Sequence, residues 1–141
     1  MDQPVIHDIA AIVQRLLAAW NSHDPQRAAA FYADDYVGED VAHGKAQHGP
    51  SDRVRVLESY VRGFPDLHFV GDVLVEHERA VLIWTMQGTH RGRFMNIPAT
   101  GRAVTVRDVS VLHFRAGKIV SGTNIWDVAG LLRALGLLPE L

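Results

Sequence analysis

Hydrophobic positions near the start of the chain recur with helical spacing. Between Ile6 and Trp20, apolar side chains return every three or four residues, which predicts an amphipathic helix. Asp24 is a favourable N-cap and Pro25 suits the first turn of a helix, so a short second helix is expected to follow and to run to about Tyr32.

The next stretch is irregular. Residues 37–50 are polar and contain glycine, and they are expected to form a loop or an irregular strand. A third helix is predicted over 51–63, with Ser51 as its cap.

From Leu67 onward the period of the hydrophobic pattern changes from 3.6 to 2. Strands are predicted at 67–76, 79–90, 103–115 and 118–126, and the short polar turns between them indicate antiparallel hairpins. A short helix over 127–138 would end the chain. Helices first and strands afterwards indicate an α+β domain over residues 1–141, with helices packed on one side of a curved antiparallel sheet.

Alternation along the predicted strands shows which side chains share a face. Asp108 has the same parity as Ser110, whereas His113 belongs to the opposite set; Asn124 and Trp126 likewise share one parity. Both sets contain apolar residues, so one face could pack against helices while the other lines a cavity or a subunit interface. Parity alone leaves open which face is which.

Composition and charge narrow the function classes. The chain has 141 residues, 48% of them hydrophobic, with 14 basic and 16 acidic side chains, and this composition is typical of one ordinary globular domain. The slight negative charge disfavours nucleic-acid binding. The N-terminus has no basic and apolar signal segment, and no apolar run approaches the roughly 18–20 residues that cross a bilayer. A cytoplasmic protein without membrane contact is expected.

The sequence lacks the residues that several kinds of functional site require. The chain has no cysteine, which excludes disulfides and thiolate sites. Its eight histidines include no pair with the helical spacing of a zinc site, so no metal is expected. Nucleotide-binding glycine loops and a nucleophile elbow are also missing from the sequence, and no cofactor is predicted.

Four motifs point to one family. They are the Gly88–Gly92 segment GTHRG, the Pro98–Gly101 turn, the Gly117-Lys118-Ile119 turn, and the terminal run WDVAGLLRALG. Together with Phe64-Pro65-Asp66-Leu67, they resemble the SnoaL-like polyketide cyclases, which belong to the cone-shaped nuclear transport factor two-like superfamily. The resemblance covers nearly the whole chain. One departure is Ala134, where members often have glutamine.

This resemblance implies a cofactor-free reaction, the intramolecular aldol ring closure of an aromatic polyketide ester. It implies that Asp127 is the acid/base and that His113 is its catalytic partner. Read from the residues alone, Asp127 could simply cap the last helix, and His113 could be a surface residue beside a hairpin. Asp66 and Asp108 are the rival candidates for a buried carboxylate.

A small aromatic or polyketide-like molecule is the expected partner, and a flat apolar pocket would suit its rings. The residues predicted to bind it are Trp20, Tyr32, Trp84, Met86, His90, Phe94 and Asn124. The same residues could instead be ordinary core.

Two alternatives to the cyclase remain open at this point. One is a related isomerase, dehydratase or hydroxylase that uses the same pocket. The other is a non-catalytic module for ligand binding or dimerisation, because one fold can carry many functions. Members of the family commonly pair through the sheet, so the resemblance also implies a homodimer.

Overall fold

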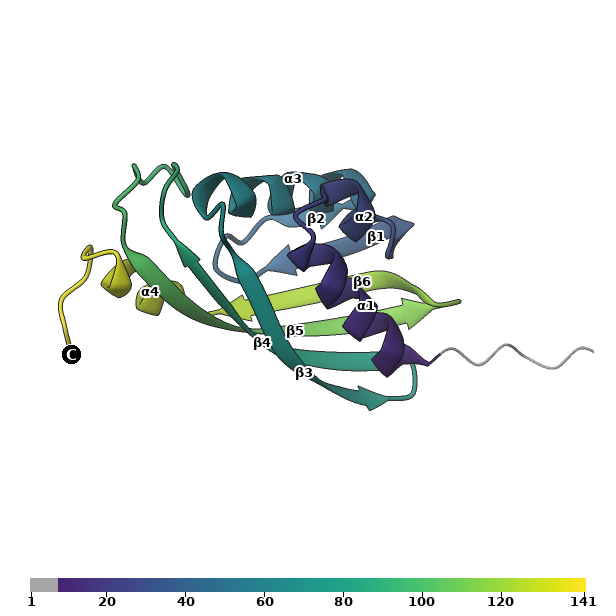
Figure 1. Ribbon diagram of the computed structural model, residues 1–141. Helices are drawn as coiled ribbons and strands as arrows, with labels where there is room; N and C mark the ends of the chain where they lie inside the picture. The colour runs from purple at the N-terminus through teal and green to yellow at the C-terminus, as the bar shows by residue number, and fades with distance from the viewer. Residues whose placement is uncertain (1–7) are drawn as a thin grey trace, which may run out of the picture.

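The computed structural model describes residues 8–141, so the predicted first turn of the N-terminal helix, including Ile6, lies outside the described residues. The helices of the described residues are α1 (Ile9–Asn21), α2 (Pro25–Ala29), α3 (Gly49–Gly63) and α4 (Val128–Ala134). Figure 1 shows α1, α2 and α3 on one side of the sheet and α4 at its end. As predicted, the Asp24 carboxylate caps α2, accepting from the backbone N–H groups of Gln26 and Arg27.

Six strands form one sheet in the described part of the chain, in the order β2-β1-β6-β5-β4-β3. Their bounds are β1 (Tyr32–Asp40), β2 (Ala46–His48), β3 (His68–Glu76), β4 (Arg79–Thr89), β5 (Ala103–Arg115) and β6 (Lys118–Trp126). The last four match the predicted strands, and both predicted hairpins are antiparallel.

The first two strands differ from the expectation. Tyr32 begins β1 rather than ending a helix, and β1 and β2 form where a loop or irregular strand was predicted. Strand β1 pairs with β6 in parallel, so the sheet is mixed rather than wholly antiparallel. Four of the nine residues of β1 are acidic, and pairing with the distant strand β6 overrides the weak local preference.

Helix α3 begins earlier than predicted. Gly49 and Pro50 form its first turn instead of a break before it, and Ser51 does not cap it. Proline fits the first turn because its missing N–H would have no partner there. The carboxylate of Asp52 accepts from the backbone N–H of His48 at 2.7 Å, in the manner of a capping box.

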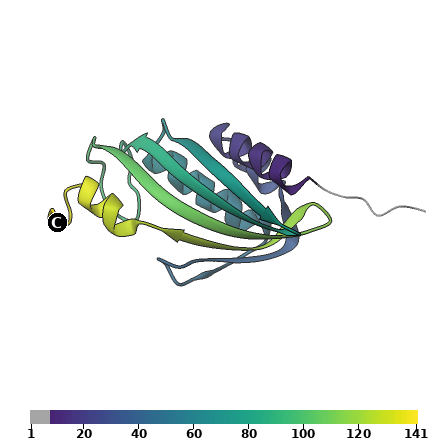
Figure 2. The same cartoon turned by 90° about the horizontal axis from the view of Figure 1, so that it is seen from below.

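The sheet has one covered face and one bare face. Seen from below in Figure 2, the strands lie in front of α3, and α1 lies beside the edge strand β3. Buried apolar side chains fill the space between the sheet and these helices, among them Val13, Leu57, Phe64 and Leu112. Along β5, buried residues alternate with more exposed ones from Val104 to Phe114. Among the described residues, no helix has the length and apolarity to cross a membrane.

Candidate active site

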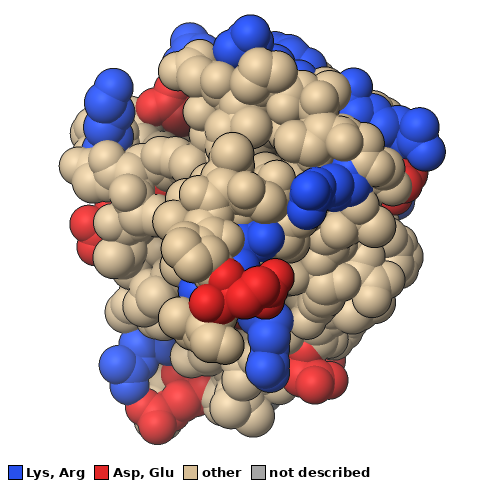
Figure 3. Space-filling view, turned by 90° about the vertical axis from the view of Figure 1, so that its left-hand side faces the viewer, with Lys and Arg blue, Asp and Glu red and all other residues tan. Residues whose placement is uncertain are grey.

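A cavity of about 400 Å³ lies between the covered face of the sheet and helices α1 and α3. Aromatic and aliphatic side chains make most of its wall: Leu16, Leu17, Trp20, Tyr60, Phe69, Leu82, Trp84, Phe94 and Leu112. Exposed residues at its rim include Arg62, Arg93 and Asn96. Figure 3 views the molecule from one end, where charged side chains are scattered among mostly uncharged ones. A mainly apolar chamber with few polar groups is the usual form of a small-molecule site.

Strand register brings the polar groups of the cavity together. Asp108 on β5 pairs with Trp84 on one side and with Trp126 on the other. Ser110, two residues along the same face, pairs with Asn124, which in turn pairs with Asp40 of β1. Polar side chains from β1, β5 and β6 therefore form one patch on an otherwise apolar wall.

Asp108 is the most perturbed carboxyl of the site. It is 4% exposed, and its Oδ1 has no hydrogen-bond partner among the described residues. Burial and, to a smaller extent, the negative charge of Asp40 raise the pKa of Asp108 to about 8, although the positive charge of Arg53 acts in the opposite direction. A carboxyl group with this pKa can exchange protons with a substrate near neutral pH.

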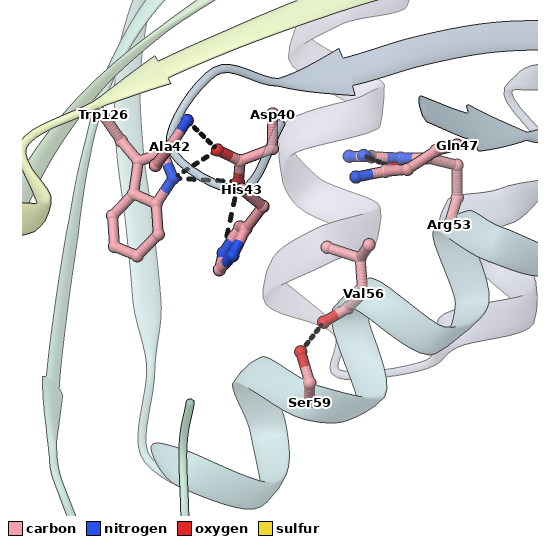
Figure 4. A network of polar contacts seen from close by, with 8 residues as sticks. All are labelled: Asp40, Ala42, His43, Gln47, Arg53, Val56, Ser59 and Trp126. Carbon is pink, nitrogen blue, oxygen red and sulfur yellow. Dashed lines mark hydrogen bonds and ion pairs between the residues drawn. The ribbon is translucent and has the colours of Figure 1, made fainter. Parts of the chain in front are cut away.

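Asp40 has a different environment. Both of its carboxylate oxygens accept from the Trp126 indole N–H at 2.8 Å, and Oδ1 also accepts from the backbone N–H of Ala42 at 2.9 Å. The ring of His43 lies 3.8 Å from Oδ2 (Figure 4). The site thus holds two carboxyl groups with opposite surroundings, one hydrogen-bonded and one desolvated.

A chain of side-chain hydrogen bonds runs along the same wall of the cavity. The indole N–H of Trp84 donates to Ser110 Oγ at 2.8 Å, and Ser110 donates to Asn124 Oδ1 at 2.7 Å. An indole nitrogen can only donate, so the serine hydroxyl accepts there and has its own hydrogen free for the amide oxygen. Asn124 also lines the cavity, and no described residue accepts a hydrogen bond from its Nδ2.

Arg53 of α3 contributes a buried positive charge. Its side chain lines the cavity, yet the residue is only 6% exposed. The guanidinium carbon lies 5.0 Å from the ring centroids of both Trp20 and Tyr32, and Nη1 donates to Gln47 Oε1 at 2.7 Å. Burial also raises the pKa of Tyr36, to about 12, so this neighbouring phenol stays protonated.

The structure brings together five of the residues predicted to bind a ligand: the cavity wall includes Trp20, Tyr32, Trp84, Phe94 and Asn124. Met86 and His90 are not among the lining residues. Met86 is 1% exposed within the core, and His90 is fully buried, with its ring beside Phe64 and its Nδ1 bonded to Thr100. A direct role for these two residues in ligand contact therefore lacks geometric support.

The two residues predicted to be catalytic also lie outside the cavity. His113 is exposed, because its position on β5 has the parity of the bare face of the sheet. Asp127 follows the end of β6 and is exposed, and its Oδ1 accepts from the backbone N–H of Gly130 at 2.8 Å. It therefore forms the N-cap of α4, which was the alternative interpretation of this residue.

Sequence reasoning missed several polar residues of this cavity. Asp108 was recognised only as a rival candidate, and Asp40 and Arg53 were not singled out. The parity of Asp108 and Asn124 was a usable signal, because it places both on one face once the inward side is known. No local pattern marks Asp40, since its strand was not predicted. Arg53 lies in an amphipathic helix, and nothing in the pattern of that helix distinguishes this buried arginine from the exposed ones.

Comparisons with known proteins agree with this architecture. AclR from Streptomyces galilaeus, a proposed hydroxylase, is 29% identical, with a TM-score of 0.85 over 95% of this chain and 84% of AclR. IdmH from Streptomyces antibioticus, a proposed polyketide cyclase, is 25% identical, with a TM-score of 0.78 over 92% of this chain and 99% of IdmH.

A third structure shares the fold. TsrD from Streptomyces laurentii is 24% identical, with a TM-score of 0.83 over 95% of this chain and 100% of TsrD. Comparison with curated proteins finds no match. The model of the SnoaL-like polyketide cyclases, however, matches residues 10–135. The chain therefore belongs to the SnoaL-like polyketide cyclase family.

Proposed function

We propose that the protein is a cofactor-independent cyclase that closes a ring by an intramolecular aldol reaction, with Asp108 as the acid/base. The observation that carries this proposal is a desolvated carboxyl group, with its pKa raised to about 8, in an apolar cavity of about 400 Å³. Family membership supports the substrate class, an aromatic polyketide with several carbonyl groups.

The ionised carboxylate of Asp108 removes a proton from a carbon that lies between two carbonyl groups. The resulting enolate carbon forms a bond to a second carbonyl carbon of the same molecule, whose oxygen takes up the electron pair. Asp108 then returns the proton to this oxygen. No electrons are gained or lost overall, so the reaction needs neither an oxidant nor a reductant. General acid/base catalysis of this kind contributes about 10²–10⁴-fold to the rate.

Other groups of the cavity complete the site. The Nδ2 amide of Asn124, held through Ser110, is suited to donate to an oxygen that becomes negative during the reaction. Trp20, Trp84 and Phe94 offer apolar surfaces for aromatic rings, and close packing brings the two reacting carbons together. Catalytic roles for Asp127 and His113, implied by family resemblance, stay predictions that substitution can test.

The first experiment is a ring-closure assay with purified protein and a panel of linear aromatic polyketide acids and esters, with the products identified by mass and NMR. We expect at least one compound to cyclise faster than it does without protein. If none cyclises while several bind, proton transfer without ring closure, as in an isomerase, becomes the better assignment. The likeness to AclR makes hydroxylated products worth measuring in the same samples.

We further propose that the bare face of the sheet pairs with a second copy of the chain. Leu74, Ile83 and Ile125 on β3, β4 and β6 are 64%, 43% and 51% exposed. Apolar side chains this exposed, on the same face of one sheet, are typical of an interface. Light scattering should give the mass of a dimer for the wild type and that of a monomer for the Leu74→Glu, Ile83→Lys double variant. A monomeric wild type would contradict the pairing.

A further inference from the structure

Arg53 carries a charge that its protein neighbours do not neutralise by contact. No carboxylate of the described residues lies within ion-pair distance of its guanidinium, although acidic groups line the same cavity. Asp40 instead uses its oxygens for Trp126 and Ala42, and Figure 4 shows this group lying apart from Arg53 and Gln47. Asp108 is mostly protonated at pH 7, because its pKa is raised to about 8.

The hydrogen bonds of Arg53 are also incomplete. A guanidinium offers five N–H donors in one plane. Gln47 Oε1 accepts from Nη1 and the phenol of Tyr32 also interacts with the guanidinium, but the buried Nε has no partner among the described residues. Aromatic rings of Trp20 and Tyr32 face the guanidinium carbon at 5.0 Å, and such rings stabilise the cation without using its N–H groups.

A buried guanidinium without a carboxylate partner and with incomplete hydrogen bonds raises the free energy of the folded protein. Removing a charge from water is unfavourable unless a partner of opposite charge and good hydrogen bonds replace the water. The missing partner must reach the guanidinium through the cavity, because the residue is 6% exposed and lines that chamber. A planar carboxylate fits best, since it accepts two parallel N–H bonds from arginine.

We propose that the cavity binds a ligand whose apolar ring system carries a free carboxylate, and that the carboxylate pairs with Arg53. This inference rests on the proposed function and deepens it: the substrate is a polyketide acid, rather than a compound whose only carboxyl group is an ester. The ring system lies against Trp20, Trp84 and Phe94 while the carboxylate anchors one end of the molecule. The anchor fixes which carbon faces Asp108.

Calorimetric titration at pH 7 with three probes tests the anchor: 2-naphthoate, its neutral isostere 2-naphthamide, and methyl 2-naphthoate. All three offer the same rings, and only the first carries a charge. We expect the wild type to bind 2-naphthoate at least about tenfold more tightly than either neutral probe, as for a charge-assisted hydrogen-bonded pair. Equal affinities in the wild type overturn the proposal without any variant.

Substitution then assigns the preference to one residue. Arg53→Met should weaken 2-naphthoate binding at least about tenfold and change 2-naphthamide binding by less than about threefold. Arg55→Met is the matched control, because it removes an exposed arginine from the same helix, and it should leave both affinities unchanged. A preference for naphthoate that survives Arg53→Met overturns the assignment. If that variant does not fold, Arg53→Lys replaces it, and its single ammonium group should also lose the paired contact.

The pairing of a ligand carboxylate with Arg53 and the proposed ring closure can be tested independently. Binding of 2-naphthoate requires no turnover, so the preference can be measured even if no compound cyclises. Asp108→Asn should abolish turnover under the proposed function and keep the preference for 2-naphthoate. If charged and neutral probes bind equally and an ester cyclises normally, the proposed role of Arg53 is wrong and the proposed reaction still holds.

Discussion

Ser110 and Asn124 are joined side chain to side chain across β5 and β6, with the serine hydroxyl donating to the amide oxygen at 2.7 Å. The same hydroxyl accepts from Trp84, so its orientation is fixed from both sides. This arrangement directs the amide nitrogen of Asn124 away from Ser110 and makes it available to a ligand in the cavity. Ser110 can therefore determine, through Asn124, where the substrate receives a hydrogen bond.

Ser110→Ala should lower kcat about tenfold and change KM little, because the amide of Asn124 loses its orientation while the apolar walls stay in place. Steady-state kinetics on the cyclised compound measure both constants. Ser121→Ala is a suitable control, since that serine lies on β6 and does not line the cavity. An equal rise in KM with constant kcat would instead indicate a role in ground-state binding.

Asp108→Asn should reduce kcat/KM by about two orders of magnitude or more, because the amide cannot accept the proton. The circular dichroism spectrum should stay that of the wild type. Asp127→Asn should keep at least about half of the activity, since asparagine is also a good N-cap for α4. The opposite ranking of the two variants would return the acid/base role to Asp127.

The pH profile should rise with pH and level off above an apparent pKa near 8, because only the ionised carboxylate of Asp108 can act as the base. Asp40→Asn removes a negative charge that raises this pKa, so the inflection should move to lower pH. Asp35→Asn changes an exposed carboxylate that is paired with Arg115 and should leave the inflection in place. A profile that falls over this range would assign Asp108 as a general acid.

The free energy of unfolding should depend on the protonation of Asp108. Between about pH 4 and pH 8, Asp108 is ionised in the unfolded chain and protonated in the folded one, so the folded state binds more protons. The contribution of Asp108 to the free energy of unfolding therefore decreases as pH rises through this range. Asp108→Asn should have a higher melting temperature than the wild type at pH 8, and the difference should shrink toward pH 4. A constant difference would mean that the carboxyl is not desolvated in the fold.

Much of the fold was predictable because local patterns and tertiary structure agree. The strands β3 to β6 alternate clearly and are joined by short polar turns, and Asp24 with Pro25 marks the start of α2. Strand β1 was not predictable in this way. Its sequence, with four acidic residues among nine, becomes a strand only through pairing with β6, which lies more than eighty residues further along the chain.

Some residues of the candidate site could likewise be predicted from local sequence patterns, and others could not. Trp84 could be recognised because a large ring near a family motif suggests a pocket, and Trp20 because its predicted helix could close the cavity from the other side. The perturbed carboxyl could not be chosen, because desolvation depends on which sheet face is covered, and both faces carry apolar groups. Asp127 adjoins the more distinctive motif, yet the strand ends before it and leaves it in solvent.

The parallel pairing of β1 with β6 also has a consequence for the order of folding. Residues 32–40 are synthesised before their partner, residues 118–126, which follow more than eighty residues later. The wall that holds Asp40, Asn124 and Trp126 therefore cannot assemble until residues 118–126 have left the ribosome. Contacts of such long sequence separation form slowly. A nascent chain that ends before β6 thus has no complete chamber in which to bind a ligand.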